Sequence, residues 1–180
     1  MISRTTIIAC KLVGTGIVGI ADQGWSVALS ADGNTALVGG FADNSYTGAV
    51  WVYSRNGDVW TQQGSKLVGM GAVGNADQGH SVALSADGNT AVVGGPRDNA
   101  YSGAAWVYTR DGSVWTQQGS KLVGTGAVGS AMQGSSVALS ADGNTAIAGA
   151  LFDNRGTGAA WVHIRSGVVW TTISAPFPEF

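Results

Sequence analysis

The sequence predicts an all-β fold assembled from three copies of one structural unit. The first observation is a gapless internal repeat of 55 residues: positions 11–65, 66–120 and 121–175 align throughout, and the first two copies are identical at 42 of 55 positions. The second is that each copy holds short apolar runs separated by turn residues, without the 3.6-residue period of a helix. A repeat of this length is typical of proteins in which each unit packs against its neighbours.

Each copy contains four extended segments. In the second copy they are SVALS (81–85), TAVVGG (90–95), AAWVYTR (104–110) and SVWTQQGSKLVG (113–124). The pairs Asp87-Gly88 and Asp111-Gly112 lie between consecutive segments and favour two-residue hairpin turns, because both residues tolerate positive φ. We therefore expect a four-stranded antiparallel meander in each copy.

A repeated four-stranded sheet of this length is the blade of a β-propeller. Large apolar side chains alternate with smaller ones along the strands, so both faces of a sheet can pack against neighbours. A β-sandwich does not predict near-identical units, and the coils of a β-solenoid are usually shorter. The predicted parts are a spare outer strand at 4–14 and blades at 26–69, 81–124 and 136–174.

The segment GTGIVGIA, at 14–21, matches the G-x-G-x-x-G spacing with which Rossmann folds bind a dinucleotide pyrophosphate. A true fingerprint opens a helix, whereas two short β-rich runs follow here. The same spacing returns at 69–76 and 124–131, each time after 55 residues. We therefore interpret it as a structural connector and expect no nucleotide cofactor.

The amino-acid composition argues against several classes of protein. Hydrophobic residues make up 44% of the chain and charged residues 11%, and the net charge is −2. The nine Lys and Arg residues are scattered, whereas nucleic-acid binding needs them clustered. No apolar run has the length of a membrane helix, and the stretch before Cys10 is too short for a signal peptide. We expect no nucleic-acid partner, no membrane span and no signal peptide in this chain.

Three sequence strings resemble the bacterial FG-GAP, or integrin-α-like, propeller repeats: QGWSVALSADGNTALVGG, DNSYTGAVWVY and WTQQGSKLVG. This resemblance implies a seven-bladed propeller, at the cell surface or outside the cell, that serves adhesion or ligand recognition. Blades of this family often carry a calcium loop, D-x-D-x-D-G-x-x-D, between the first two strands. Here that place holds ADGN with one carboxylate per copy, whereas calcium takes six to eight oxygens. We therefore expect no metal and no cofactor.

Candidate ligand-binding residues lie in the loops between the second and third strands and in the connectors between blades, which share one end of the propeller. Eight of the 13 differences between the first two copies lie there, at positions 15, 17, 20, 25, 41, 42, 45 and 47. Loops on a rigid scaffold often carry binding residues. Trp25, His80 and Ser135 occupy one divergent repeat position and could line a central mouth. Alternatively, this is a loosely constrained rim position.

The same loops hold a dipeptide that is identical in all copies: Asp43-Asn44, Asp98-Asn99 and Asp153-Asn154. These side chains are expected to bond nearby backbone and hold the loop, as Asx turns do. A repeated polar ligand or ion site is the alternative. Tyr46 and Tyr101, two residues further along, are included among the candidate binding residues.

Six of the seven tryptophans form two repeat-equivalent sets: Trp51, Trp106 and Trp161, and Trp60, Trp115 and Trp170. Packing between blades is the favoured explanation, and sugar-binding platforms are the alternative. No nucleophile, base and orienting group can be proposed from spacing. We predict a non-catalytic binding or scaffolding module for a protein or a cell surface. A carbohydrate-binding lectin is the main alternative, and a hydrolase or lyase is less favoured.

Three blades are fewer than the four to eight of known propellers, and both ends of the arc would expose apolar blade faces. The spare strand at 4–14 could complete a blade across a subunit boundary. Two chains would supply six blades with two-fold symmetry, the commonest in homo-oligomers. The sequence therefore predicts a homodimeric six-bladed ring, with a larger ring or a piece of a longer propeller as alternatives.

Overall fold

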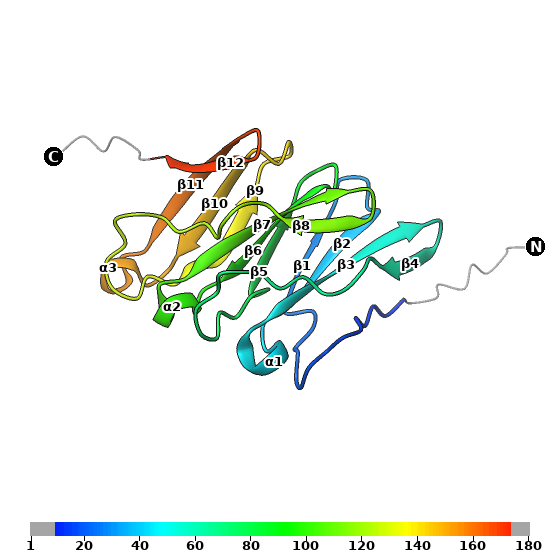
Figure 1. Ribbon diagram of the computed structural model, residues 1–180, viewed down its shortest axis with the longest axis horizontal. Helices are drawn as coiled ribbons and strands as arrows, with labels where there is room; N and C mark the ends of the chain where they lie inside the picture. The colour runs from blue at the N-terminus through cyan, green and yellow to red at the C-terminus, as the bar shows by residue number, and fades with distance from the viewer. Residues whose placement is uncertain (1–9, 174–180) are drawn as a thin grey trace, which may run out of the picture.

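A computed structural model describes residues 10–173 and shows three four-stranded antiparallel sheets side by side (Figure 1). The first consists of β1 (Ser26–Leu29), β2 (Thr35–Gly40), β3 (Ala49–Asn56) and β4 (Val59–Gln62). The second consists of β5 (Ser81–Leu84), β6 (Thr90–Gly95), β7 (Ala104–Asp111) and β8 (Val114–Gln117). The third consists of β9 (Gln133–Leu139), β10 (Thr145–Ala150), β11 (Ala159–Ser166) and β12 (Val169–Ile173).

In each sheet the strands pair in chain order, so each repeat is a meander. The first strands of neighbouring sheets lie together, β1 beside β5 and β5 beside β9. The predicted all-β fold of three propeller blades is confirmed. Of the predicted spare strand, residues 4–9 lie outside the described residues, and residues 10–14 contain no strand.

Both faces of the middle blade are buried. Leu37, Val50 and Val52 of the first blade pack against its one face, which carries Val93 and Trp106. Its other face contributes Val92 and Val107 to a second cluster, with Ala146 and Ala148 of the third blade. All six residues of β6 are buried, as the apolar composition of both strand faces requires.

A third cluster lies on the outward side of the first blade. Val38, Trp51 and Tyr53 form its buried part together with Ala21, and Leu12 packs against it. Ala21 and Leu12 belong to the connector that precedes the blade, so the chain folds back over its own first sheet.

The hairpins follow the predicted strand boundaries, but their turns differ from the predicted ones. The β7–β8 loop is Gly112-Ser113, where Gly112 has a φ of 58° as the first loop residue. The β5–β6 loop runs over residues 85–89, and only its glycine, Gly88, has positive φ. The prediction of a two-residue turn at Asp87-Gly88 is therefore wrong. Asp87 accepts hydrogen bonds from Ser85 Oγ (2.5 Å) and from Asn89 N (3.0 Å), which stabilise a longer loop.

The G-x-G-x-x-G segments are connectors that lie on buried tryptophans. A Cβ on Gly69 would be 2.2 Å from Cδ1 of Trp106, so only glycine fits there. Trp106 Nε1 donates to the carbonyl oxygen of Met70 (2.9 Å). Gly71 and Gly74 have φ values of 77° and 73°, which favour glycine in the rest of the connector. The glycine spacing thus serves packing and turning of the chain.

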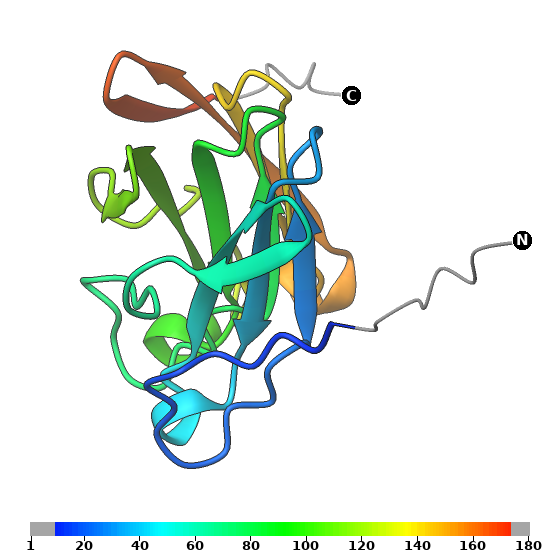
Figure 2. The same ribbon diagram turned by 90° about the vertical axis from the view of Figure 1, so that its right-hand side faces the viewer.

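Within residues 10–173, no helix is long and apolar enough to cross a membrane. The helical elements are three single turns, α1 (Asp43–Tyr46), α2 (Asp98–Tyr101) and α3 (Asp153–Gly156), each between the second and third strand of a blade. Figure 2 shows these turns and the connectors at one end of the sheets, and the β1–β2, β5–β6 and β9–β10 hairpins at the other. We call the first end the loop face.

Candidate functional site

The turns α1 and α2 are left-handed. Asn44, Ser45 and Tyr46 have φ values of 50°, 54° and 68°, and the equivalent residues of α2 are nearly the same. Non-glycine residues rarely adopt this conformation, which costs about 1–2 kcal/mol per residue. The surrounding contacts must therefore hold the turns in place.

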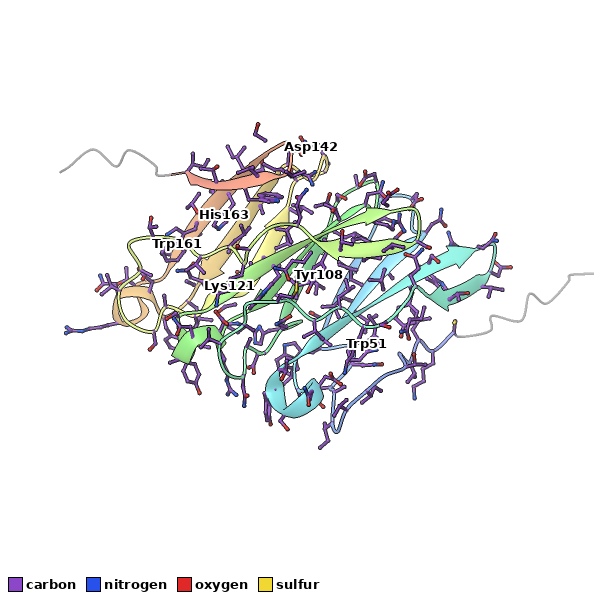
Figure 3. The ribbon with its side chains drawn as sticks, in the orientation of Figure 1. Trp51, Tyr108, Lys121, Asp142, Trp161 and His163 are labelled. Carbon is purple, nitrogen blue, oxygen red and sulfur yellow. The ribbon has the colours of Figure 1, made fainter. Side chains whose placement is uncertain are left out.

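An aspartate anchors each turn to the connector of its own repeat. Asp98 Oδ1 accepts a hydrogen bond from Val73 N (2.7 Å), and Asn99 N donates to the carbonyl oxygen of Val73 (2.9 Å). Asp98 Oδ2 also forms an ion pair with Lys121, which is labelled in Figure 3. Its side chain is about 1% exposed. The aspartate thus bonds backbone 25 residues earlier in the chain, whereas an Asx turn would use adjacent backbone.

The other two copies repeat this anchor with one difference. Asp43 accepts from Val18 N (2.8 Å) and pairs with Lys66. Asp153 accepts from Val128 N (2.7 Å), but the position equivalent to the lysine is a proline in the sequence, at 176, outside the described residues. The Asp-Asn pairs therefore position the loop face, and in two copies the carboxylate already has a cationic partner.

An arginine lies between two tyrosines on this face. The guanidinium carbon of Arg97 is 5.6 Å from the ring centroid of Tyr46 and 5.5 Å from that of Tyr101. These distances are typical of cation–π contacts. Both tyrosines are 45% exposed. The left-handed turns thus present two aromatic rings from neighbouring blades to one cation.

Beside Arg97 and its two tyrosines, three further rings from the first two blades gather: Trp25, Phe41 and His80. Trp25 lies 4.6 Å from Phe41 and 5.7 Å from His80, measured between ring centroids, and Phe41 lies 6.0 Å from Tyr46. Trp25 is 57% exposed, so much of its indole faces solvent. We call Trp25, Phe41, Tyr46, His80, Arg97 and Tyr101 the aromatic–arginine cluster.

A buried carboxylate lies beneath this cluster. Asp77 Oδ2 is 3.2 Å from Arg97 Nε, and its side chain is 5% exposed. Burial raises the pKa of Asp77 to about 6, and the guanidinium of Arg97 opposes this rise. Burial lowers the pKa of His80, and the Ser135 backbone opposes that shift. Near pH 7 the carboxylate is therefore ionised and the imidazole neutral.

Two buried polar atoms of the site have no hydrogen-bond partner, namely Asp77 Oδ1 and His80 Nδ1. Buried polar groups normally have one, so these atoms have unused capacity for hydrogen bonding. Ser135, the third member of the predicted set, donates its Oγ proton to the carbonyl oxygen of Met132 (2.5 Å). The structure thus brings Trp25 and His80 together, while the hydroxyl of Ser135 is engaged with its own loop.

Two open hollows flank the turns of the second and third blades. One, of about 500 Å³, lies between the connector at 73–75 and the α2 turn, with Arg97 and Tyr101 at its wall. The other, of about 430 Å³, lies between Tyr101 and the third blade, with Phe152 and Arg155 at its wall. Tyr101 is common to both, so the cluster continues along the loop face towards the third blade.

The sequence alone did not predict a role for Phe41, Asp77 or Arg97 in the site. Phe41 and the position equivalent to Arg97 are among the loop positions that differ between the first two copies. The divergence between copies therefore included both of them. Asp77 has an aspartate at the same place in the first copy, Asp22, and gives no such signal. What distinguishes Asp77 is its pairing with an arginine that occurs in one copy alone.

The two tryptophan sets pack within and between blades. Trp51 and Trp106 are fully buried on β3 and β7, and Trp161 occupies the same place on β11 (Figure 3). Trp115 and Trp170 each donate Nε1 to a glutamine of the preceding blade, Gln63 (3.1 Å) and Gln118 (2.9 Å) respectively. Packing and hydrogen bonding therefore account for Trp51, Trp106, Trp115 and Trp170.

The second histidine is part of the core. His163 is 1% exposed and occupies the repeat position of Tyr53 and Tyr108. Its Nδ1 lies 3.0 Å from Thr172 Oγ1, and burial lowers its pKa. Among the described residues, no three His, Cys, Asp or Glu side chains gather closely enough to hold a metal ion.

Comparison with known proteins supports the fold. No family model matches the sequence, and no curated protein sequence matches it. Similar solved structures include Kuenenia stuttgartiensis hydrazine synthase, with a TM-score of 0.50, 15% identity, and coverage of 91% of this chain and 38% of that one. A candidate 6-phosphogluconolactonase from Bacteroides uniformis has a TM-score of 0.58 and 14% identity, with 87% and 40% covered. Saccharomyces cerevisiae Sqt1 has a TM-score of 0.54 and 13% identity, with 90% and 37% covered.

These neighbours have β-propeller folds, and at such low identity the likeness concerns the fold alone. The chain spans about two fifths of the length of each of them. Its three sheets correspond to three blades of a propeller. The likeness to FG-GAP repeats stays a resemblance of sequence.

Proposed function

We propose that this protein is a non-catalytic β-propeller module that binds a protein ligand through the loop face. The observation that carries the proposal is the aromatic–arginine cluster, in which Trp25, Tyr46 and Tyr101 are each at least 45% exposed and the two tyrosines flank Arg97. Tryptophan, tyrosine and arginine are the residues most enriched at binding hot spots. The resemblance to FG-GAP repeats favours a role in recognition at the cell surface or outside the cell.

The scaffold beneath the cluster supports this role. The ion pair of Asp98 with Lys121, and the bonds of Asp98 and Asn99 to Val73, fix the turn that carries Tyr101. The equivalent bonds fix the turn that carries Tyr46. A rigid scaffold reduces the entropy lost when a ligand binds. The rings are therefore presented in one arrangement before the ligand arrives.

The chemistry of the cluster favours acidic and aromatic side chains in the ligand. Arg97 keeps a side-chain exposure of 41%, although it pairs with Asp77. A guanidinium held by aromatic faces can still donate to a carboxylate, and exposed rings stack on aromatic groups. We expect peptides with both kinds of residue to bind.

Panning a random peptide library against the purified protein tests the proposal. We expect acidic, aromatic peptides to be enriched, and to bind at least tenfold more weakly after Trp25→Ala or Arg97→Ala. Val168→Ala is the matched control, because Val168 is 71% exposed on the β11–β12 hairpin and lies outside the cluster. If no peptide binds saturably, or binding survives both changes, the proposal is wrong.

A carbohydrate ligand is the second candidate, favoured by the exposed indole of Trp25 next to the unpaired Asp77 Oδ1 and His80 Nδ1. Sugars stack their C–H faces on indoles and bond polar groups at their hydroxyls. A glycan array of the same protein distinguishes the two functions. Saturable glycan binding that is lost in Trp25→Ala, without peptide binding, would support the lectin.

A further inference from the structure

The same set of hydrogen bonds joins each blade to the next. Ser26 Oγ donates to the carbonyl oxygen of Gly79 (2.7 Å), and Ser81 Oγ donates to that of Gly134 (2.8 Å). At the β1–β2, β5–β6 and β9–β10 hairpins, Ala31 N donates to Ala86 O and Ala86 N to Ala141 O, both at 3.0 Å. The junctions between the first and second and the second and third blades are therefore built alike.

On the loop face, the junctions also share backbone bonds. Asp77 N donates to Tyr46 O (2.9 Å) and Gln78 N to Thr47 O (3.1 Å). At the second junction, Met132 N donates to Tyr101 O (2.8 Å), in the same repeat position. Each blade thus offers acceptors at its α turn and receives donors from the connector of the next blade.

The two ends of the arc carry the complementary halves of this set. On the third blade, Ser136 Oγ, Ala141 N and Gly156 O make no interblade bond within residues 10–173. On the first blade, Asp22 N, Gly24 O and Ala31 O make none within the same range. Each free donor at one end therefore has its free acceptor at the other end, at the matching repeat position.

Apolar side chains repeat this pattern. Val27 is 68% exposed on the first blade, whereas Val82, at the same repeat position, packs into the core between the first two blades. Ile147 is 38% exposed on the third blade, whereas its equivalents Leu37 and Val92 are 0% and 1% exposed. Val82 and Leu37 share one cluster, so the exposed Val27 and Ile147 are the two halves of such a contact.

We propose that a second copy of this chain covers both ends, so that two chains close head to tail into a ring of six blades. The third blade of each copy packs against the first blade of the other, as the first blade packs against the second within the chain. Ser136 Oγ then donates to Gly24 O of the other copy, and Ala141 N to Ala31 O. A second copy is the partner that fits, because its first blade takes the place of a following blade. The first repeat is identical at 42 of 55 positions to the second, which fills that place within the chain.

Ring geometry selects two copies. Propellers have four to eight blades, so two chains give a permitted number and three chains do not. The junction between copies lacks one hydrogen bond of the internal ones: Ile173 stands where Gln63 and Gln118 accept a hydrogen bond from the next tryptophan. Trp60 lacks that acceptor in the ring. We therefore expect the junctions between copies to open before the internal ones.

Light scattering coupled to size exclusion tests the proposal on the whole chain. We expect a mass twice the 18.2 kDa of one chain at micromolar concentration. A folded, cooperative monomer, or a mass of three or more chains, would overturn the six-bladed ring. A mass measurement needs no ligand, so its outcome is separate from that of the proposed binding function.

Two charged variants test the contact itself. Val27→Asp and Ile147→Lys should each be monomeric. In a homodimer of either variant, both junctions would bury one charged side chain that has no partner of opposite charge. Mixed together, they should form a heterodimer, because one junction is then native and the other pairs Asp with Lys. Val168→Asp, on an exposed hairpin, should stay dimeric. Dimers of either variant alone, or no dimer in the mixture, would overturn the contact.

Discussion

Replacing Gly69 by alanine should destabilise the protein through a clash with one buried ring. The added Cβ would lie 2.2 Å from Cδ1 and 2.5 Å from Cγ of Trp106. Trp106 is fully buried and its Nε1 is bonded to the connector, so the ring cannot turn away without losing that bond. Gly69 does not have positive φ, so backbone strain adds nothing to the cost.

The size of the effect follows from the overlap. Carbon atoms in contact are separated by about 3.5–4.0 Å, so the ring or the connector must move by more than about 1 Å. Overpacking of a core costs about 1–3 kcal/mol, and a fixed indole places this site at about 3 kcal/mol. For a chain of this size, that lowers the Tm by about 6–12 °C.

Thermal unfolding of Gly69→Ala beside Gly71→Ala is the direct assay. Gly71 belongs to the same connector and has no atom within 4 Å of an added Cβ, but its φ is 77°. Its substitution should cost about 1–2 kcal/mol, from backbone strain alone. In a double-mutant cycle with Trp106→Ala, the clash should disappear, giving a coupling energy of about 2–3 kcal/mol. A Gly69→Ala cost no larger than that of Gly71→Ala, or a coupling energy near zero, would refute the packing explanation.

Three further outcomes are expected. His163→Tyr should reduce the loss of Tm on acidification. Burial lowers the pKa of His163, so the folded protein favours the neutral imidazole. The stability from this preference is complete above about pH 6.5, and it is lost as the pH falls below that value. Melting curves of both proteins from about pH 7 to about pH 5 measure the difference. Asp98→Asn should cost about 2–4 kcal/mol in denaturant unfolding, because it leaves Lys121 unpaired, and Asp153→Asn should cost less than half of that. Millimolar calcium or a chelator should shift the Tm by less than about 2 °C, because each ADGN turn has one carboxylate and that of Asp87 is bonded to Ser85 and Asn89.

The blades could be predicted because the repeat reports on packing directly. Trp51 and Trp106 each pack against the connector glycine of their own repeat, so both copies keep tryptophan and the alternation of large and small residues stays visible. The first hairpin could not be predicted as well. Asp-Gly suits a two-residue turn, but Ser85 and Asn89 donate hydrogen bonds to Asp87 and stabilise a five-residue loop instead.

The ion pairs and the aromatic–arginine cluster depend on folding that spacing does not reveal. Asp98 and Lys121 are 23 residues apart, and only the return of the chain from β8 brings them together. Arg97 has alanine and phenylalanine at its repeat positions, so no pattern marks it as the cation between two tyrosines. Residues that occur once in a repeat protein need the structure before their partners are known.

This division between repeated and single residues connects the two proposals. The repeated residues, such as Gly69 and Asp98, form the bonds that every blade needs, whereas Trp25, His80 and Arg97 differ in each copy and meet on the loop face. In a closed ring, all α turns point to the same side, so two chains would present two aromatic–arginine clusters in one plane. Two linked sites bind a surface with several ligands far more tightly than one site does, because the second contact forms at high effective concentration. A ring of two copies therefore suits weak recognition of a repeated ligand, for which one cluster alone would suffice only at high concentration.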